Sequence, residues 1–218
     1  MRANRQNVQA VLIVDVVRST ALADRLRPLL AARLRMLSRV HTAAKRVRLP
    51  YEVTAGDEFQ TLAMAPAEVP TLIFELRRLS RPLVLRIGVG FGEIAGRITV
   101  PVNRLTGEAF VRARSALERV HESRVHRFQV LTAFCAEEPG FEAVANTLYG
   151  LHDTLVRKIS EKQWQTINAY LKTNRVDLTA RSLGVNVSTV SRNLQRGYLR
   201  QMQETVATME QLIDACFG

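Results

Sequence analysis

Hydrophobic positions change their spacing several times along the first part of the chain, and each spacing predicts an element. Apolar runs or alternation predict strands over Val8–Val16, Tyr51–Thr54, Glu58–Ala63, Leu83–Ile94 and His126–Thr132. Helical spacing predicts helices over Thr20–Leu26, Leu29–Arg48, Ala67–Leu79 and Gly107–His121. The second and third strands flank a tight turn and form a hairpin. This order of elements is that of an α+β, ferredoxin-like sheet with additions.

The pattern becomes entirely helical from about Asp153 onward. Three short helices precede a long one over Tyr198–Ala215, whose apolar stripe is able to pair with a second copy. All seven prolines lie at or before Pro139, so the residues that interrupt helices and strands also become rarer here. We expect a ferredoxin-like domain over 1–138, a connecting helix or linker over 139–157, and an all-α domain over 158–218.

The segment 178–196 has the layout of a helix-turn-helix. Gly184 supplies the turn and Ala180 lets two helices cross closely, while Leu183, Val185, Val190 and Leu194 are expected to form their shared core. The second helix, over Val187–Arg196, then presents an outer face made of Ser188, Thr189, Arg192, Asn193 and Arg196. Such side chains suit base edges and phosphates, which predicts double-stranded DNA as a partner. A helical protein-interaction module without DNA is the alternative.

Charge supports a polyanionic partner. The chain of 218 residues carries 31 Lys and Arg against 20 Asp and Glu, a formal net charge of +11, and only four of the basic residues are lysines. Arginine binds phosphate oxygens in pairs through its planar fork. No apolar run approaches the roughly 18 residues that span a bilayer. With two widely separated cysteines and no disulfide framework, we expect a cytoplasmic protein with reduced thiols.

Three acidic residues are candidate metal ligands. Asp15 ends the first buried strand, where a carboxylate is costly unless it is paired or bound to a cation. Asp57 and Glu58 lie at the hairpin turn, which this topology brings near the first strand. Together they could hold Mg²⁺ or Mn²⁺ with nucleoside triphosphate oxygens. Ordinary helix-start and turn residues are the alternative interpretation.

The segment after Asp15 is a candidate phosphate-binding loop. Val16, Val17, Arg18, Ser19 and Thr20 open a helix whose free N–H groups would face the phosphates.

The strand over Leu83–Ile94 carries three glycines on one face, Gly88, Gly90 and Gly92. A bare face permits close approach by a helix or a nucleotide, and helix packing is favoured. His121 and His126 are five residues apart, so on a helix they point in different directions, which excludes a zinc-protease motif.

With these residues, the N-terminal part resembles the palm domain of class III nucleotide cyclases and GGDEF-type diguanylate cyclases. The resemblance rests on the segments Val11–Thr20, Ala55–Phe59, Arg86–Glu93 and Gly107–Arg114. Over nearly its whole length the chain is more similar to the SatD family of bacterial proteins. The resemblance implies that Asp15 and Asp57 take the places of the two metal-binding aspartates, and that the backbone of 16–20 cradles a triphosphate.

The departures from the cyclase pattern concern catalysis. Val53 stands where cyclases usually place a purine-reading lysine, and Val111 and Ser115 stand where they carry an asparagine and a transition-state arginine. Arg112 and Arg114 lie beside these positions, in a different register, as candidate phosphate contacts.

Three hypotheses follow from these residues. The first is a nucleotide-responsive DNA-binding regulator, in which the palm domain binds a nucleoside triphosphate with Mg²⁺ and biases the helix-turn-helix, as a homodimer. The second is a metal-dependent nucleotidyl cyclase or oligonucleotide synthase that uses Asp15 and Asp57. The third is a structural protein whose acids are remnants. The missing purine and transition-state residues favour the first.

Overall fold

The computed structural model describes residues 8–17, 23–98, 101–122 and 128–218. Its five strands form one sheet in the order β2-β3-β1-β4-β5. They span Gln9–Val16 (β1), Val47–Ala55 (β2), Glu58–Ala63 (β3), Leu85–Gly92 (β4) and Thr132–Cys135 (β5). β1 lies antiparallel between β3 and β4, and β5 adds in parallel to β4. The first four strands therefore have the predicted ferredoxin-like order.

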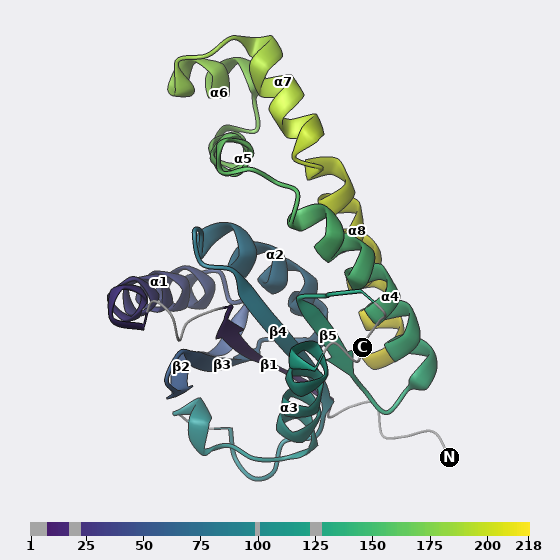
Figure 1. The fold of residues 1–218 in the computed structure, drawn as a ribbon. Helices are drawn as coiled ribbons and strands as arrows, with labels where there is room; N and C mark the ends of the chain where they lie inside the picture. Colours follow the sequence, from purple (N-terminus) through teal and green to yellow (C-terminus); the bar gives the residue numbers. More distant parts are fainter. Residues whose placement is uncertain (1–7, 18–22, 99–100, 123–127) are drawn as a thin grey trace.

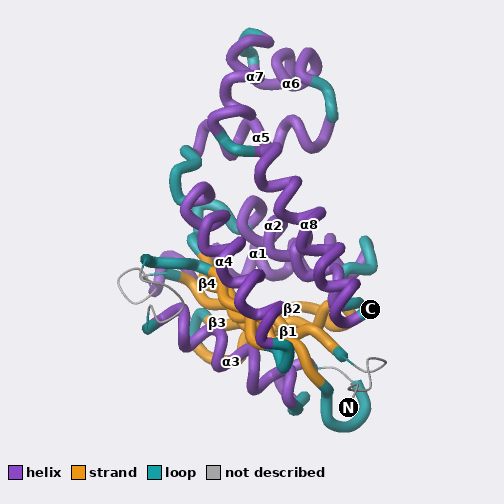
Figure 2. The backbone as a smooth tube through the Cα atoms, turned by 90° about the vertical axis from the view of Figure 1, so that its right-hand side faces the viewer, coloured by secondary structure: helices purple, strands orange, loops and turns teal. Residues whose placement is uncertain are grey.

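Eight α-helices are present in the part of the chain that the structure describes. They span Ala23–Ala43 (α1), Val69–Leu79 (α2), Glu108–His121 (α3), Pro139–Val156 (α4), Glu161–Thr173 (α5), Val176–Leu183 (α6), Val187–Arg196 (α7) and Leu199–Phe217 (α8). Figure 2 shows α3 on one side of the strands and α1, α2, α4 and α8 on the other.

The glycine-rich face of β4 is covered by α3. A Cβ atom at Gly88 would lie 2.4 Å from the carbonyl oxygen of Ala113, and one at Gly90 would lie 2.1 Å from that of Ala109. Backbone at that distance leaves no room for any side chain. The favoured interpretation of these glycines as a helix-packing face is confirmed.

Two of the hydrophobic cores contain residues of α8. The larger lies over the sheet on the side of α1 and α2, and it also contains Phe141 of α4 and Met209 and Ile213 of α8. The smaller surrounds Trp164 and Ile167 of α5 together with Leu199 and Met202 of α8. Below, "sheet unit" means β1–β5, α1–α4 and the C-terminal half of α8, and "helical tip" means α5–α7 and the first turns of α8.

This packing differs from the predicted division at 139–157. α4 is part of the sheet unit, because Phe141 and Tyr149 pack edge-on or tilted against Phe134 of β5. α8 belongs to both units, and Phe217 near its end stacks on Phe91 of β4. Figure 1 shows α8 running from the helical tip back to the sheet.

The apolar stripe of the last helix is therefore used within the chain. Met202, Met209 and Ile213 are fully buried against the two cores. The stripe that the sequence offers for pairing with a second copy is therefore already covered by α4, α2 and α5.

Two element predictions also need correction. Ala23–Ala43 forms one helix with Pro28 inside it, so the proline removes one backbone hydrogen bond without ending the helix. The last strand lies at Thr132–Cys135 rather than 126–132, because Thr132, Ala133 and Phe134 pair with β4. Residues 126 and 127 of the predicted strand lie outside the described residues, and Phe128 is exposed.

No described helix combines the length and the apolar content needed to cross a lipid bilayer. Cys135 and Cys216 are both half-buried, and neither forms a disulfide within the described residues.

Candidate functional site

Asp15 lies beside Arg86 at the end of β1. The two residues are direct cross-strand partners in the antiparallel register, so their side chains share the α3 face of the sheet. Arg86 donates to both carboxylate oxygens, from Nε to Oδ1 at 2.9 Å and from Nη2 to Oδ2 at 2.8 Å. His121, the last residue of α3, places Nε2 2.8 Å from the same Oδ2. Two side chains therefore surround the Asp15 carboxylate with nitrogen.

The hairpin turn brings the other two predicted carboxylates to this end of the sheet. Gly56 adopts a left-handed conformation (φ +60°), as a tight turn requires, and Asp57 follows it. Oδ2 of Asp57 accepts a hydrogen bond from the backbone N–H of Val16 at 3.2 Å. The turn is thereby tied to the strand that carries Asp15, so the structure brings together Asp15, Asp57 and Glu58.

Glu58 is held by a second arginine. Both of its oxygens accept hydrogen bonds from Arg114 of α3, and Oε1 also accepts one from Thr54 at 2.6 Å. Partial burial would raise the pKa of Glu58, but the hydrogen bonds from Arg114 and Thr54 outweigh it, so that the pKa is lowered. The carboxylate is ionised and already paired.

These contacts test whether the cluster fits a divalent cation. Mg²⁺ needs carboxylate oxygens that face it in an octahedral shell. Here both oxygens of Asp15 and both of Glu58 face guanidinium groups, from Arg86 and Arg114. Within the described residues no group of three acidic, His or Cys side chains is arranged to hold a metal ion. The residues in this arrangement do not fit resident Mg²⁺ or Mn²⁺, because Arg86 supplies the positive charge at Asp15.

The predicted phosphate-binding segment is described only in part. The N–H of Val16 donates to Asp57, and the N–H of Val17 donates to the carbonyl of Val84 at 2.8 Å. Arg18, Ser19 and Thr20 lie outside the described residues.

The two arginines of α3 point to different places. Arg114 joins the carboxylate cluster through Glu58. Arg112 instead donates to the carbonyl of Phe91 at 2.7 Å and lies near Glu108 and Glu137, at the start of the helix. The structure therefore does not bring Arg112 to Asp15.

Arg86 and His121 are the residues of this cluster that sequence reasoning did not assign. The signal for Arg86 was present: it is the one charged residue of a strand otherwise made of glycine and apolar residues, opposite a strand that ends in an aspartate. His121 could not be found in this way, because only the docking of α3 brings its last turn to β1.

At the helical tip, α6 and α7 are joined by a short turn. Gly184 ends α6 in the left-handed conformation (φ +65°), and its N–H bonds the carbonyl of Arg181. α7 packs on α5 and α6, and its Val190 is fully buried. Leu183 and Val185, expected in the shared core, are instead 38% and 41% exposed, because the turn lies at the end of the molecule (Figure 1).

The five residues predicted on the outer face of α7 separate into two groups. Ser188, Arg192 and Arg196 are exposed. Thr189 is half-buried, and Asn193 turns inward, where its Nδ2 donates to Oγ1 of Thr166 on α5 at 3.0 Å. Asn193 therefore fastens α7 to α5.

The free face of the tip is uniformly basic. Residues 178–203 include four arginines, Arg181, Arg192, Arg196 and Arg200, and no acidic residue. All four are exposed, and none forms an ion pair with any residue that the structure describes. By contrast, the exposed Arg175 at the start of α6 is paired with Asp177 at 2.8 Å.

The comparisons with known proteins place the chain in a family. The family model described as the SatD family matches residues 9–200. No curated protein matches.

Solved structures give partial likenesses. A class III adenylyl cyclase-like ATP-binding protein from Pseudomonas aeruginosa is 19% identical with a TM-score of 0.46, over 67% of this chain and 37% of that one. An adenylate cyclase from Trypanosoma brucei in its monomeric state is 18% identical with a TM-score of 0.40, over 50% of this chain and 67% of that one.

Proposed function

The chain belongs to the SatD family, and we propose that it is a nucleotide-responsive DNA-binding regulator. In this proposal α6 and α7 form a helix-turn-helix with α7 as the recognition helix. The sheet unit binds a nucleotide, and binding biases the position of the tip. Two chains act together, because a single helix-turn-helix gains affinity from two half-sites.

The observation that carries the DNA part is the unpaired arginine face of the tip. Four exposed arginines that form no ion pair with any described residue create a positive field, which favours the phosphates of a duplex. Ser188, Arg192 and Arg196 extend along the free side of α7, from its first turn to its last. Phosphates would be contacted by Arg196, Arg200 and Arg181, while Ser188 and Arg192 would reach base edges.

α8 supplies the link between the two units. At 1.5 Å per residue, this helix of 19 residues is about 28 Å long. Leu199 and Met202 at its start lie in the core of the tip, whereas Met209 and Ile213 lie in the core of the sheet unit. A shift of either core against α8 would therefore move the tip relative to the sheet.

The geometry weighs against the alternative of a metal-dependent nucleotidyl enzyme. Asp15 and Asp57 do meet at the end of β1, as that chemistry would require, and this is the observation in its favour. However, Arg86 holds both oxygens of Asp15, so a metal ion would first have to displace an aligned guanidinium pair. The proposed function therefore includes no metal-dependent reaction step. Contacts of Val16–Thr20 and Arg114 with a nucleotide remain part of the proposal.

DNA binding can be tested with the full chain. Duplexes enriched from a random pool would be titrated by fluorescence anisotropy at several salt concentrations. Arg192→Ala should weaken binding by about 1–3 kcal/mol if this residue reads a base, and Arg196→Ala should lower the salt slope by about 1. The matched control is Arg175→Ala, which removes an exposed arginine that is already paired. If no duplex is retained in a salt-dependent way, the regulator function is wrong.

The enzyme alternative is tested by a product assay. Each nucleoside triphosphate would be incubated with the protein and Mg²⁺ or Mn²⁺, beside Asp15→Ala and Asp57→Ala variants, and separated by chromatography. We expect intact triphosphate in every sample. A new product that disappears in both variants would establish nucleotidyl chemistry and contradict the proposal.

A further inference from the structure

A cavity of about 630 Å³ lies where the sheet unit meets the helical tip. Its floor comes from the end of β1 and the start of β4, and its roof comes from the turn between α4 and α5. This volume is in the range of small-molecule sites in proteins. It opens on the side of the sheet opposite the Asp15 cluster, because Val16 packs with the α2 side whereas Asp15 faces α3.

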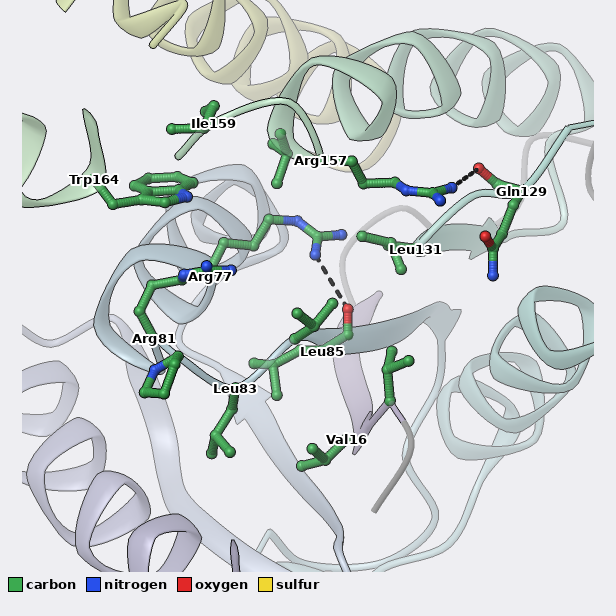
Figure 3. A pocket seen from close by; sticks show the side chains of 14 residues that line it. Val16, Arg77, Arg81, Leu83, Leu85, Gln129, Leu131, Arg157, Ile159 and Trp164 are labelled. Carbon is green, nitrogen blue, oxygen red and sulfur yellow. Dashed lines mark hydrogen bonds between the residues drawn. The ribbon is translucent and has the colours of Figure 1, made fainter. Parts of the chain in front are cut away.

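The lining combines apolar walls with positive charge. Leu83, Leu85 and Leu131 line the sheet side (Figure 3). The lining also contains three arginines, Arg77, Arg81 and Arg157, and one aromatic ring, that of Trp164, and none of the described lining residues carries a carboxylate. Such a site favours a ligand with an apolar or planar body and an anionic group.

Buried polar atoms at this cavity are left without partners. Trp164 is 1% exposed, and its indole Nε1 has no hydrogen-bond partner among the described residues. The same is true of Nε of Arg77 and of Arg81. A buried donor that stays unpaired is costly, so its presence points to a partner that completes it. In Figure 3 the indole lies over the side chains of Arg77 and Arg81.

The three arginines differ in how far protein carboxylates and carbonyl groups already satisfy their guanidinium groups. Arg77 is held by Asp153 at 2.8 Å and by the carbonyl of Leu85. Arg81 pairs with Glu161, yet burial still lowers the pKa of its guanidinium. Arg157 is exposed at the rim, where its one described contact is a long hydrogen bond of 3.5 Å to the carbonyl of Gln129. Arg81 and Arg157 are therefore the groups that an added anion would contact.

We propose that this cavity binds a nucleoside monophosphate or a ligand of the same chemistry, a planar heteroaromatic body that carries phosphate. The base would lie at the edge of the Trp164 indole and accept a hydrogen bond from its Nε1, and the phosphate would be bound by Arg81 and Arg157. No metal ion takes part, because the arginines supply the positive charge. This site is separate from the nucleotide contacts proposed above for Arg114, and the inference rests on the proposed function only for the effect on DNA.

A ligand bound in the cavity would contact residues of the helical tip directly. Trp164 and Ile159 line the cavity and also belong to the core of the helical tip. A ligand that contacts both Trp164 and Arg81 would fix the tip against the α2–β4 corner of the sheet unit. The angle at which α7 is presented would then depend on the ligand.

Binding can be measured directly, because Trp164 is the only tryptophan of the chain. The full-length protein, with a chelator present, would be titrated with AMP, GMP, CMP and UMP while its tryptophan fluorescence is recorded. Inorganic phosphate and benzoate serve as separate arms that carry only the anion or only a planar carboxylate. We expect a saturable change with at least one nucleotide, and none with phosphate or benzoate at the same concentrations.

Variants identify the binding groups. Arg157→Gln should weaken binding about tenfold or more, because it removes a charge-assisted contact to the phosphate. It lies at the rim, so the fold does not depend on it. Arg81→Gln should act in the same direction, and Arg39→Gln on the exposed side of α1 should leave binding unchanged.

Several outcomes would overturn the assignment: no fluorescence change with any nucleotide, unchanged affinity in Arg157→Gln, or equal saturation by benzoate or phosphate. The readout is independent of DNA. Nucleotide binding without DNA retention would leave the cavity assigned and remove the regulator function, and DNA retention without nucleotide binding would do the reverse.

Discussion

Three arginines of the sheet unit and four of the helical tip have different roles, although the residue type is the same. In the sheet unit Arg77, Arg86 and Arg114 each meet a carboxylate, from Asp153, Asp15 and Glu58 respectively. At the tip, Arg192 and its three neighbours meet none within the described residues. A paired guanidinium holds elements together, whereas an unpaired one on the surface is available to a phosphate. The net charge of +11 therefore says less about function than its distribution does.

The largest effect on stability is expected at Arg77, a paired arginine of the sheet unit. This buried side chain links α2, β4, β5 and α4 through Leu85, Thr132 and Asp153. Arg77→Met leaves the carboxylate buried and unpaired, so the free energy of unfolding should fall by about 3–5 kcal/mol. Denaturant unfolding at neutral pH measures it. The double variant Arg77→Met/Asp153→Asn removes both charges and should regain part of the loss; a loss below 1 kcal/mol for the single variant, on the order of a surface pair, would contradict the structural role.

The same pair predicts how stability depends on pH. Burial would raise the pKa of Asp153, but the charge of Arg77, with the nearby His152 and a hydrogen bond from the N–H of Leu131, lowers it below its usual range. A depressed pKa contributes stability that is present above the unfolded pKa of about 3.9 and is lost as pH falls through the folded pKa. The stability difference between the wild type and Arg77→Met should therefore shrink when unfolding is measured below about pH 4. A difference that grows on acidification would mean that the assigned direction is wrong.

An intermediate effect is expected at Arg86, which tests whether it takes the place of a cation. Arg86→Gln leaves Asp15 with His121 alone and should lower the free energy of unfolding by about 1–3 kcal/mol. If Arg86 supplies the positive charge here, Mn²⁺ should raise the melting temperature of this variant and leave that of the wild type unchanged. Arg104→Gln, on the short helix before α3, is the control. An equal shift in the wild type would show that a metal ion competes with Arg86 after all.

The smallest effect on stability is expected at Arg192, an arginine of the helical tip that forms no ion pair with the described residues. Arg192 is exposed and donates only to the carbonyl of Ser188 in its own helix. Arg192→Gln should change the free energy of unfolding by less than about 0.5 kcal/mol, although it should weaken DNA binding. Thermal unfolding of this variant beside Arg175→Gln would check it. A large loss of stability at Arg192 would mean that this arginine is structural too.

Alternation and glycine placement were enough to predict the sheet unit in outline. Gly88, Gly90 and Gly92 share a face because strand side chains repeat every two residues, and α3 packs on that face. The strand order followed because few topologies connect this sequence of elements. The last strand was misplaced by several residues, since a short apolar segment does not show which of its residues will pair with β4.

Side-chain partners at the candidate site could not be predicted in the same way. The sequence indicates that Asp15 needs a cation, but only the register between β1 and β4 makes Arg86 that cation. Likewise, the sequence predicts that Asn193 faces outward, but the packing of α7 on α5 places its side chain against Thr166.

Local patterns determine elements, because hydrophobic spacing and turn chemistry act over a few residues. On its own, the sequence of this protein therefore established a mixed sheet-and-helix unit, a helical C-terminal part and an arginine-rich segment free of acids. Long-range packing settled the rest. It joined α4 and the end of α8 to the sheet core, paired the carboxylates at β1 with arginines, and formed a cavity from four segments between Val16 and Trp164. Contacts between residues so far apart in the sequence depend on how whole elements dock, and the spacing of residues along the chain does not predict that docking.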